Sequence, residues 1–451
     1  MKCPFCGSDF RIQDVIEKNE EEMITGCVKC ECSEFPVVEG ILILKASSLN
    51  KRIVRLIKER RIYEAIIHCF GWDYFEKLFE SYVPLRLPKK IQWALGRSLF
   101  SLGYAELIRE HGKIYRAYSD KSLPFHDVLG NTYLRNRFSC ETFWSIYPFI
   151  PLLKRKKSRI LDLGCGAGHS SFVISKYVEP QQHCCADLSY QRLYLAKKYF
   201  AQNAEFVCLN ANSPLPFKDK IFDTIMMLDS FHYVYGRACL AREMERALLP
   251  GGLILLPHLH NSLAHIRTGG YPLTPQTYTN LFDSDQLEVK VMPEIRILKD
   301  FLYKNKLDLV EKYSEEELNF SIALTLLATS DKSLFKVYDR VNRDFLSVKN
   351  NLVINPIYEM KQDNDSVLLV RSSRKYLLLY EDCYPLTEKY LPEKYEISKE
   401  LVSGRKVHIS DLEKAEDMMK RFVAINVPED YLDTRVLEAA KENKQYSPFR
   451  D

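Results

Sequence analysis

The residues best suited to chemistry are an aspartate and three closely spaced glycines, in the run Asp-Leu-Gly-Cys-Gly-Ala-Gly at 162–168. Glycine has no Cβ, so the backbone at these positions can adopt positive φ and lie directly against a ligand. The residues before the run predict the end of a buried strand, and the apolar spacing from Ser170 to Tyr177 predicts a helix after it. A glycine-rich turn between strand and helix is typical of a loop that binds a nucleotide-type cofactor.

Two classes of cofactor use such a turn, and the glycine spacing separates them. Dinucleotide-binding folds favour Gly-x-Gly-x-x-Gly or Ala. Here the third glycine, Gly168, comes one residue early, and His169 occupies the final position of that pattern. The spacing therefore disfavours NAD. The pattern Asp-x-Gly-x-Gly-x-Gly resembles the first motif of the class I S-adenosylmethionine-dependent methyltransferases.

The resemblance continues at four further stretches, in the order in which that family places them. These are a short strand ending in an acid (Cys184–Asp187), a strand followed by Asn210-Ala211 (204–211), a loop and fourth strand (215–232), and a helix, Pro-Gly-Gly turn and fifth strand (247–256). A further strand is expected at 321–328. The resemblance implies an α/β, Rossmann-like core of seven strands, spanning residues 151–330, that binds S-adenosylmethionine.

The resemblance also assigns roles to individual residues. Asp187 has the spacing of a ribose hydroxyl acceptor, about twenty residues after the loop, and also suits a helix N-cap. Leu188 and Ala211 would cover the adenine faces. Asn210 would meet the adenine edge, where the family commonly has an aspartate. The full set of implied cofactor-binding residues is Asp162, Gly164, Cys165, Gly166, Gly168, Asp187, Leu188, Asn210, Ala211 and Asp229.

Methyl transfer from a sulfonium is an in-line displacement, so an enzyme contributes mostly alignment and exclusion of water. Asp229 follows the fourth strand and could orient the methionine amino group or the acceptor. A hydroxyl acceptor needs a base, for which His232 is the first candidate and His258 and His260 are alternatives. A neutral amine acceptor needs none. The predicted catalytic residues are His232 and Asp229.

Two Cys-x-x-Cys pairs near the N-terminus, Cys3/Cys6 and Cys27/Cys30, have the spacing of a zinc ribbon. Four thiolates close a tetrahedral shell and leave no position for a substrate, which predicts a structural Zn²⁺. Cys32 lies close enough in sequence to replace Cys30. A redox pair, or thiols without a ligand, is the alternative interpretation.

Residues 35–44, Phe-Pro-Val-Val-Glu-Gly-Ile-Leu-Ile-Leu, resemble the end of the small zinc-binding activator subunit of eukaryotic tRNA and release-factor methyltransferases. The resemblance covers residues 1–46 and implies a zinc ribbon that either binds substrate or covers the core. The apolar stretch Ile41–Leu44 predicts a strand that buries against another element, which favours a cover.

Two further regions flank the core. Residues 47–150 are expected to form a helical linker or lid, with helices at Ile62–His68, Trp72–Phe79 and Ile91–His111. The family resemblance allows Tyr133 or Arg137 to meet the cofactor carboxylate, but ordinary packing or surface charge is the favoured interpretation of both residues. Residues 331–451 are expected to form an α+β module of unknown role, for which binding of a protein or carrier partner is one option. In that module, 353–358 and 367–370 predict a hairpin, and 409–423 predicts a helix.

Composition sets outer limits on function. The chain has 451 residues, 46% of them hydrophobic, and 64 basic against 60 acidic residues give a net charge of +4. That excess is too small to indicate nucleic-acid binding. The basic runs 51–61 and 154–159 read as solvated surface, with phosphate contact as the alternative. Thirteen cysteines, no membrane-length apolar stretch and no apolar run after Met1 predict a cytoplasmic protein with no membrane partner.

The sequence thus predicts a methyltransferase that acts on the oxygen or nitrogen of a small molecule, with S-adenosylmethionine and structural Zn²⁺ as cofactors. An RNA methyltransferase that uses the ribbon for rRNA or tRNA binding is the alternative. A non-catalytic S-adenosylmethionine-binding scaffold is the second alternative.

Overall fold

A computed structural model describes residues 1–19, 22–45, 48–70, 137–138, 141–154, 159–264, 270–282, 286–341, 352–355, 357–362, 365–371, 392–408 and 412–427. The predicted helices at 72–79 and 91–111, together with Tyr133, lie outside these residues. The helix predicted at 62–68 is confirmed, because residues 62–70 are helical.

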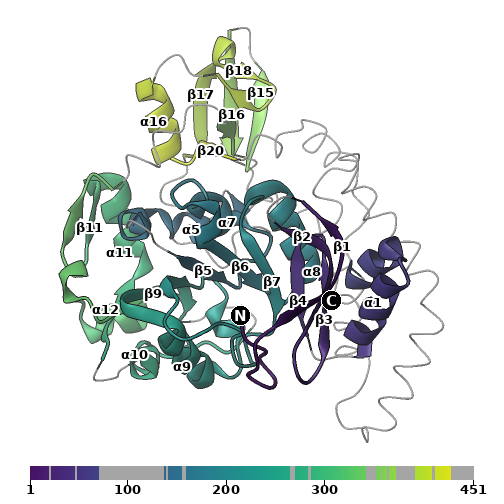
Figure 1. The fold of residues 1–451 in the computed structure, drawn as a ribbon. Coiled ribbons are helices and arrows are strands. Elements are labelled where there is room, and N and C mark those ends of the chain that lie inside the picture. The colour runs from purple at the N-terminus through teal and green to yellow at the C-terminus, as the bar shows by residue number, and fades with distance from the viewer. Residues whose placement is uncertain are drawn as a thin grey trace, which may run out of the picture.

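One mixed sheet of eleven strands forms the centre of the fold (Figure 1). Its order is β1-β2-β3-β4-β7-β6-β5-β8-β9-β12-β10. The strands are β1 (Arg11–Lys18), β2 (Met23–Lys29), β3 (Glu34–Val38), β4 (Ile41–Leu44), β5 (Ile160–Leu163), β6 (His183–Asp187), β7 (Glu205–Leu209), β8 (Phe222–Met226), β9 (Leu248–His260), β10 (Glu288–Pro293) and β12 (Ala323–Thr329). The seven strands from β7 to β10 in this order lie within residues 160–329, and β1 to β4 extend the same sheet on the β7 side, so the predicted seven-stranded core stays a prediction.

Helices pack on both faces of this sheet. They are α1 (Ser48–Lys58), α5 (Glu141–Trp144), α6 (Ile150–Leu153), α7 (His169–Ile174), α8 (Tyr190–Leu195), α9 (Arg237–Ala247), α10 (Pro275–Phe282), α11 (Glu294–Lys299) and α12 (Glu315–Phe320). Short 3-10 helices are η2 (Tyr147–Phe149), η3 (Pro180–Gln182), η5 (Phe231–Tyr233) and η7 (Lys332–Leu334), and η4 (Ala196–Phe200) and η6 (Asp300–Lys304) are π-helical. In Figure 1, α5 and α7 lie above the sheet, and α9 and α10 lie below it.

Burial on both faces explains why the central strands are apolar throughout. Neighbouring residues of β6 point to opposite sides. Cys185 packs with α7 and α8, whereas Cys184 and Ala186 pack with α9 and α10. β4, β7, β6, β5, β8 and β9 pair in parallel, and β12 pairs antiparallel with both β9 and β10. The parallel strands therefore share one carboxyl edge, where their following loops lie side by side.

The first 44 residues form an edge of the sheet. Ile41 to Leu44 of β4 pair in parallel register with Phe206 to Leu209 of β7. The Tyr190 hydroxyl donates to the Val38 carbonyl (3.3 Å), and Lys197 Nζ lies 2.8 Å from Glu22 Oε1. The strand predicted at 41–44 is confirmed, and its parallel pairing makes the N-terminal segment a cover for the β7 edge.

The C-terminal part contains three small sheets and one described helix. Their elements are β11 (Lys306–Asp308), β13 (Val337–Asp339), β14 (Leu352–Ile354), β15 (Tyr358–Gln362), β16 (Ser366–Arg371), β17 (Lys394–Ser398), η8 (Lys399–Leu401), β18 (Val402–Ser403), β19 (Lys406–Val407), α16 (Leu412–Lys420) and β20 (Ala424–Asn426). The predicted hairpin exists, but β15 is its first strand. Val353 belongs to β14, which pairs with β19 and β20. The boundaries at residues 46, 150 and 330 stay predictions.

Within the described part of the chain, every helix is too short or too polar to cross a lipid bilayer.

Replacing Ile41 tests whether β4 belongs to the folded core. Ile41 is fully buried, so Ile41→Ala should lower the free energy of unfolding by about 3 kcal/mol. Ile12 on β1 is 70% exposed, so Ile12→Ala should change it by less than about 0.5 kcal/mol. Urea unfolding followed by circular dichroism measures both. Equal, small effects would mean that the N-terminal strands are a loosely attached arm.

Candidate functional site

The glycine loop lies between β5 and α7, as the sequence predicts. Gly164, Gly166 and Gly168 all have positive φ, at 71°, 56° and 93°. A Cβ on Gly168 would lie 2.7 Å from the Cβ of Ala196, so a larger residue does not fit there. The Gly164 and Cys165 amides donate to the Ala186 carbonyl at 2.7 and 3.1 Å, which ties the loop to the end of β6.

Asp187 ends β6 and holds this loop in place. Its Oδ2 accepts from the Gly166 amide (2.9 Å), and its Oδ1 accepts from the Ser189 amide (2.8 Å). The N-cap of α8 is Ser189, whose side chain accepts from the Arg192 amide, so the alternative cap role for Asp187 is corrected. Leu188 presents an apolar side chain that is 41% exposed.

Asn210 and Ala211 follow β7, next to the end of β6. Asn210 is exposed, and its Oδ1 accepts from the Asn212 amide (2.9 Å). The carboxyl ends of β5, β6 and β7 therefore bring the glycine loop, Asp187-Leu188 and Asn210-Ala211 to neighbouring positions.

Asp162 sits behind the loop, fully buried. Ser170 and Ser171 donate their hydroxyls to its Oδ2 at 2.8 and 2.7 Å, and its Oδ1 has no hydrogen-bond partner in the described structure. Burial raises the pKa of Asp162 to about 7. These bonds fix the start of α7 against β5, so this carboxyl positions the loop from within the core.

A second group of polar residues lies at the carboxyl ends of β8 and β9. Asp229 is largely buried, and its Oδ2 lies 2.8 Å from Arg137 Nη1. Its Oδ1 faces two imidazoles, His260 Nε2 at 3.4 Å and His232 Nε2 at 4.0 Å. Burial raises the pKa of Asp229, but the positive charges of Arg137 and His258 outweigh it and hold that pKa below its ordinary value.

His258 is held by an acid that the sequence did not single out. Its Nδ1 lies 2.6 Å from Glu294 Oε1, its backbone amide donates to Glu294 Oε2 (2.8 Å), and its Nε2 lies 3.3 Å from Thr142 Oγ1. Burial lowers the pKa of His258, but Glu294 and Asp229 raise it to about 9. His258 therefore carries a positive charge near neutral pH. Glu294 begins α11 and carries no motif that could have signalled this role.

His232 is fully buried and stacks on His260, with 3.8 Å between ring centroids and 19° between ring planes. Burial and the charge of His260 lower the pKa of His232 to about 3. A ring with that pKa is neutral at physiological pH and accepts a proton poorly. The assignment of His232 as a general base stays a prediction. The buried, stacked geometry favours a neutral ring whose nitrogen offers its lone pair to a ligand.

A family model described as "Methyltransferase domain" matches residues 161–256, which contain the glycine loop, Asp187, Asn210, Asp229 and His232. This part of the chain is a class I S-adenosylmethionine-dependent methyltransferase domain. The fold and the loop geometry predicted from the sequence agree with it.

Known proteins resemble the methyltransferase domain at low identity. The ubiquinone/menaquinone biosynthesis C-methyltransferase UbiE of Proteus mirabilis is 30% identical over 141 residues, which are 29% of this chain and 56% of that protein. The fatty-acid O-methyltransferase of Mycolicibacterium smegmatis is 30% identical over 98 residues, 22% of this chain and 35% of that protein. The chain thus spans about half or less of the length of these relatives. The structure of YcgJ from Bacillus subtilis matches 42% of this chain and 99% of its own, with 20% identity and a TM-score of 0.31.

Exposed tyrosines lie next to the buried histidines of the methyltransferase domain. Tyr233, Tyr235 and Tyr271, which we call the rim tyrosines, are 55%, 79% and 52% exposed. Tyr271 meets Tyr235 edge to face, and its amide donates to the His232 carbonyl (2.8 Å). Tyr233 packs against the His232 ring, with 4.2 Å between centroids. The stacked rings of His232 and His260 therefore lie next to the rim tyrosines, with Tyr233 in direct contact with His232.

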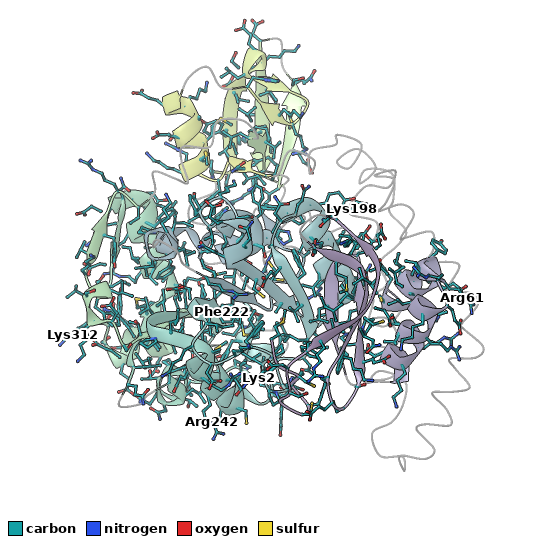
Figure 2. All side chains as sticks on the ribbon, in the orientation of Figure 1. Lys2, Arg61, Lys198, Phe222, Arg242 and Lys312 are labelled. Atoms are coloured by element: carbon teal, nitrogen blue, oxygen red, sulfur yellow. The ribbon has the colours of Figure 1, made fainter. Side chains whose placement is uncertain are left out.

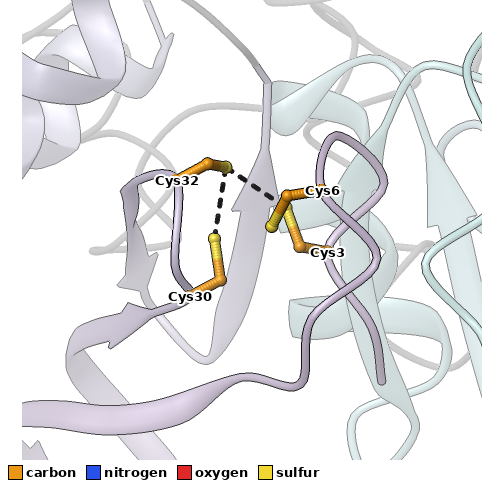
Figure 3. A group of neighbouring side chains, drawn as sticks. All are labelled: Cys3, Cys6, Cys30 and Cys32. Carbon is orange, nitrogen blue, oxygen red and sulfur yellow. Dashed lines mark hydrogen bonds between the residues drawn. The ribbon is translucent and has the colours of Figure 1, made fainter.

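Four cysteines outside the methyltransferase domain form a separate group (Figure 3). The Sγ atoms of Cys3, Cys6, Cys30 and Cys32 all lie within 4.8 Å of one another. The predicted ligand Cys27 is corrected, because it lies inside β2 and packs in the core with Val38 and Ile41. Cys32 takes its place, so the second pair is Cys30-x-Cys32.

The pKa of Asp162 predicts how stability depends on pH. An unfolded aspartate titrates near ~3.9, so between that value and about 7 the folded state keeps a proton that the unfolded state has lost. The free energy of unfolding should therefore fall as pH rises through this window. Asp162→Asn is neutral at every pH and should remove this fall.

Denaturant titrations at about pH 5 and about pH 8 measure the effect. From the lower to the higher pH, we expect the free energy of unfolding to fall by about 2 kcal/mol more in the wild type than in Asp162→Asn. The same pH dependence in both proteins would show that Asp162 is already ionised in the fold.

Proposed function

We propose that this chain is an enzyme that transfers the methyl group of S-adenosylmethionine to a small-molecule acceptor. The observation that carries this proposal is the glycine loop with three positive φ angles, placed against Asp187 inside a methyltransferase domain. These features of the loop fit a cofactor whose methionine and ribose portions lie close to the backbone.

The residues around the loop fit the cofactor in detail. The Asp187 carboxylate would accept from the ribose hydroxyls, and the exposed Leu188 would pack on the adenine together with Ala211. Asn210 would meet the adenine edge. The Ser230 hydroxyl is buried without a hydrogen-bond partner in the described structure and lies against Gly164, so it offers a polar contact on the inner side of the loop.

S-adenosylmethionine supplies an electrophilic methyl group, and the residues of this chain align the acceptor with it. Arg137, His260 and the end of β8 hold Asp229 ionised in one orientation, from which it can accept a hydrogen bond from an amino group or from the acceptor. Glu294 fixes the His258 ring and its charge beside Asp229. The histidines of this group are buried, which limits their contact with bulk water.

The surface favours a small acceptor over RNA. The basic run 51–61 is balanced by acids, because Arg55 pairs with Glu59, Lys58 with Glu34, and Arg61 with Glu59 and Glu64. The basic side chains Arg61, Arg242 and Lys312 lie far apart at the edge of the molecule in Figure 2, and the apolar Phe222 lies near its centre. The rim tyrosines offer flat apolar surface beside the site. The names of the two curated relatives, a quinone-biosynthesis and a fatty-acid methyltransferase, also point to small apolar acceptors.

We further propose that Cys3, Cys6, Cys30 and Cys32 hold a structural Zn²⁺. Four thiolates complete a tetrahedral shell, which suits a structural metal. Metal at this position would join the first residues of the chain to the turn that follows β2, and so stabilise the sheet edge formed by β1 to β4.

The proposed transfer is tested with methyl-labelled S-adenosylmethionine and a host extract separated into small-molecule, RNA and protein fractions. We expect label in the small-molecule fraction. Asp187→Ala, which removes the hydrogen bonds to the Gly166 and Ser189 amides and the ribose acceptor, should weaken cofactor binding measured by calorimetry by about tenfold or more. Asp219→Ala changes an exposed carboxylate and is the matched control.

Label in RNA would overturn the small-molecule assignment and make the N-terminal region a candidate RNA-binding surface. Cofactor binding without transfer to any fraction would instead support a non-catalytic scaffold.

Paired cysteine variants test the zinc proposal. Cys6→Ser should remove the bound zinc, measured by mass spectrometry of the metal in folded protein, and should lower the melting temperature. Cys27→Ser should lower stability through its buried position and leave the zinc content unchanged. Zinc lost from Cys27→Ser, or kept in Cys6→Ser, would contradict this ligand set.

A further inference from the structure

Three side chains at the ends of β8 and β9 have the composition of a metal site. One ligand atom each from Asp229, His232 and His260 lies within 4.8 Å of the other two. The Asp229 Oδ1 faces both imidazole Nε2 atoms, at 3.4 and 4.0 Å. Arg137 binds the other carboxylate oxygen, Oδ2, and so leaves Oδ1 directed at the histidines.

His232 gives independent evidence for a ligand. Its side chain is completely buried, and neither ring nitrogen has a hydrogen-bond partner in the described structure. Burying an imidazole without a partner costs free energy unless another group satisfies it. The ring has little room to turn, because His260 stacks on it and a Cβ added at Gly270 would lie 3.0 Å from its Cδ2.

The backbone is also shaped to present these groups. Asp229 has a φ of 50°, which is uncommon for a residue other than glycine. Such conformations cluster at functional sites, where the surroundings maintain them. His258 is excluded as a ligand, because Glu294 binds its Nδ1 and Thr142 lies against its Nε2.

We propose that Asp229, His232 and His260 bind a divalent transition-metal ion. Two imidazoles and one carboxylate suit zinc or ferrous iron and leave coordination positions open, which is typical of catalytic metal sites. The four-cysteine group, in contrast, leaves none. The site is therefore distinct in chemistry from the proposed structural zinc.

The charges around the site set its strength. The Arg137 guanidinium lies 2.8 Å from Asp229 Oδ2. Its positive charge opposes a cation, so this site should bind metal more weakly than the four cysteines and fill after them.

The role of this metal rests on the proposed function. An acceptor hydroxyl at an open position would ionise more readily, because a metal lowers the pKa of a bound hydroxyl. Its proton would pass to water, its oxygen would form a bond to the methyl carbon, and the carbon–sulfur bond would break with its electron pair left on sulfur. The acceptor class is therefore a hydroxyl, such as a phenol or enol that packs on the rim tyrosines.

Cobalt binding tests the site without any substrate. Co²⁺ titrated into the full-length protein that carries one equivalent of zinc should add one equivalent with weak visible absorption and no thiolate-to-metal charge transfer. His232→Gln and His260→Gln should each weaken this binding by about tenfold or more. His408→Gln, which changes an exposed histidine, should leave it unchanged and controls for surface binding.

Proton NMR of the wild-type protein keeps the test decisive if a histidine variant misfolds, because bound Co²⁺ should shift the ring signals of two histidines. The metal site would be overturned if Co²⁺ showed no saturable binding, or if both folded histidine variants still bound it. The methyl-transfer assay would still test the proposed function separately. Binding with transfer that a chelator does not slow would overturn only the proposed role.

Discussion

The site depends on the parallel pairing of β4, β7, β6, β5, β8 and β9, which are neighbours in that order in the sheet. Parallel strands must all run the same way, so every segment that follows them leaves the sheet at one edge. Residues as distant in sequence as Gly164, Asn210 and His260 meet there for that reason. The pairing also demands cover on both faces, which the helices and the two cores supply.

The parts of the site that the sequence predicted are those encoded locally. The glycine loop needs positive φ, and each buried strand is an apolar run that ends in a polar residue, so the positions of Asp187 and Asp229 follow from spacing. Glu294 and Thr142 could not be found in this way. They reach His258 from α11 and α5, and only the long-range packing of those helices brings them together.

The error at Cys27 has a related cause. Cys-x-x-Cys spacing predicts a metal-binding turn only where the chain turns between the two thiols. β2 instead stays extended through Lys29, so Cys27 faces the core while Cys30 leaves the strand. The edge strand β10 was missed because it mixes exposed and buried residues and is stabilised by its pairing with β12.

The covalent link between β4 and the rest of the chain has a consequence for β7. An unpaired edge strand exposes amide and carbonyl groups that can pair with other chains and start aggregation. Because β4 is tethered, it competes for that edge at a high effective concentration that does not change when the protein is diluted. The edge is therefore protected from intermolecular strand pairing in every molecule, whatever the protein's abundance.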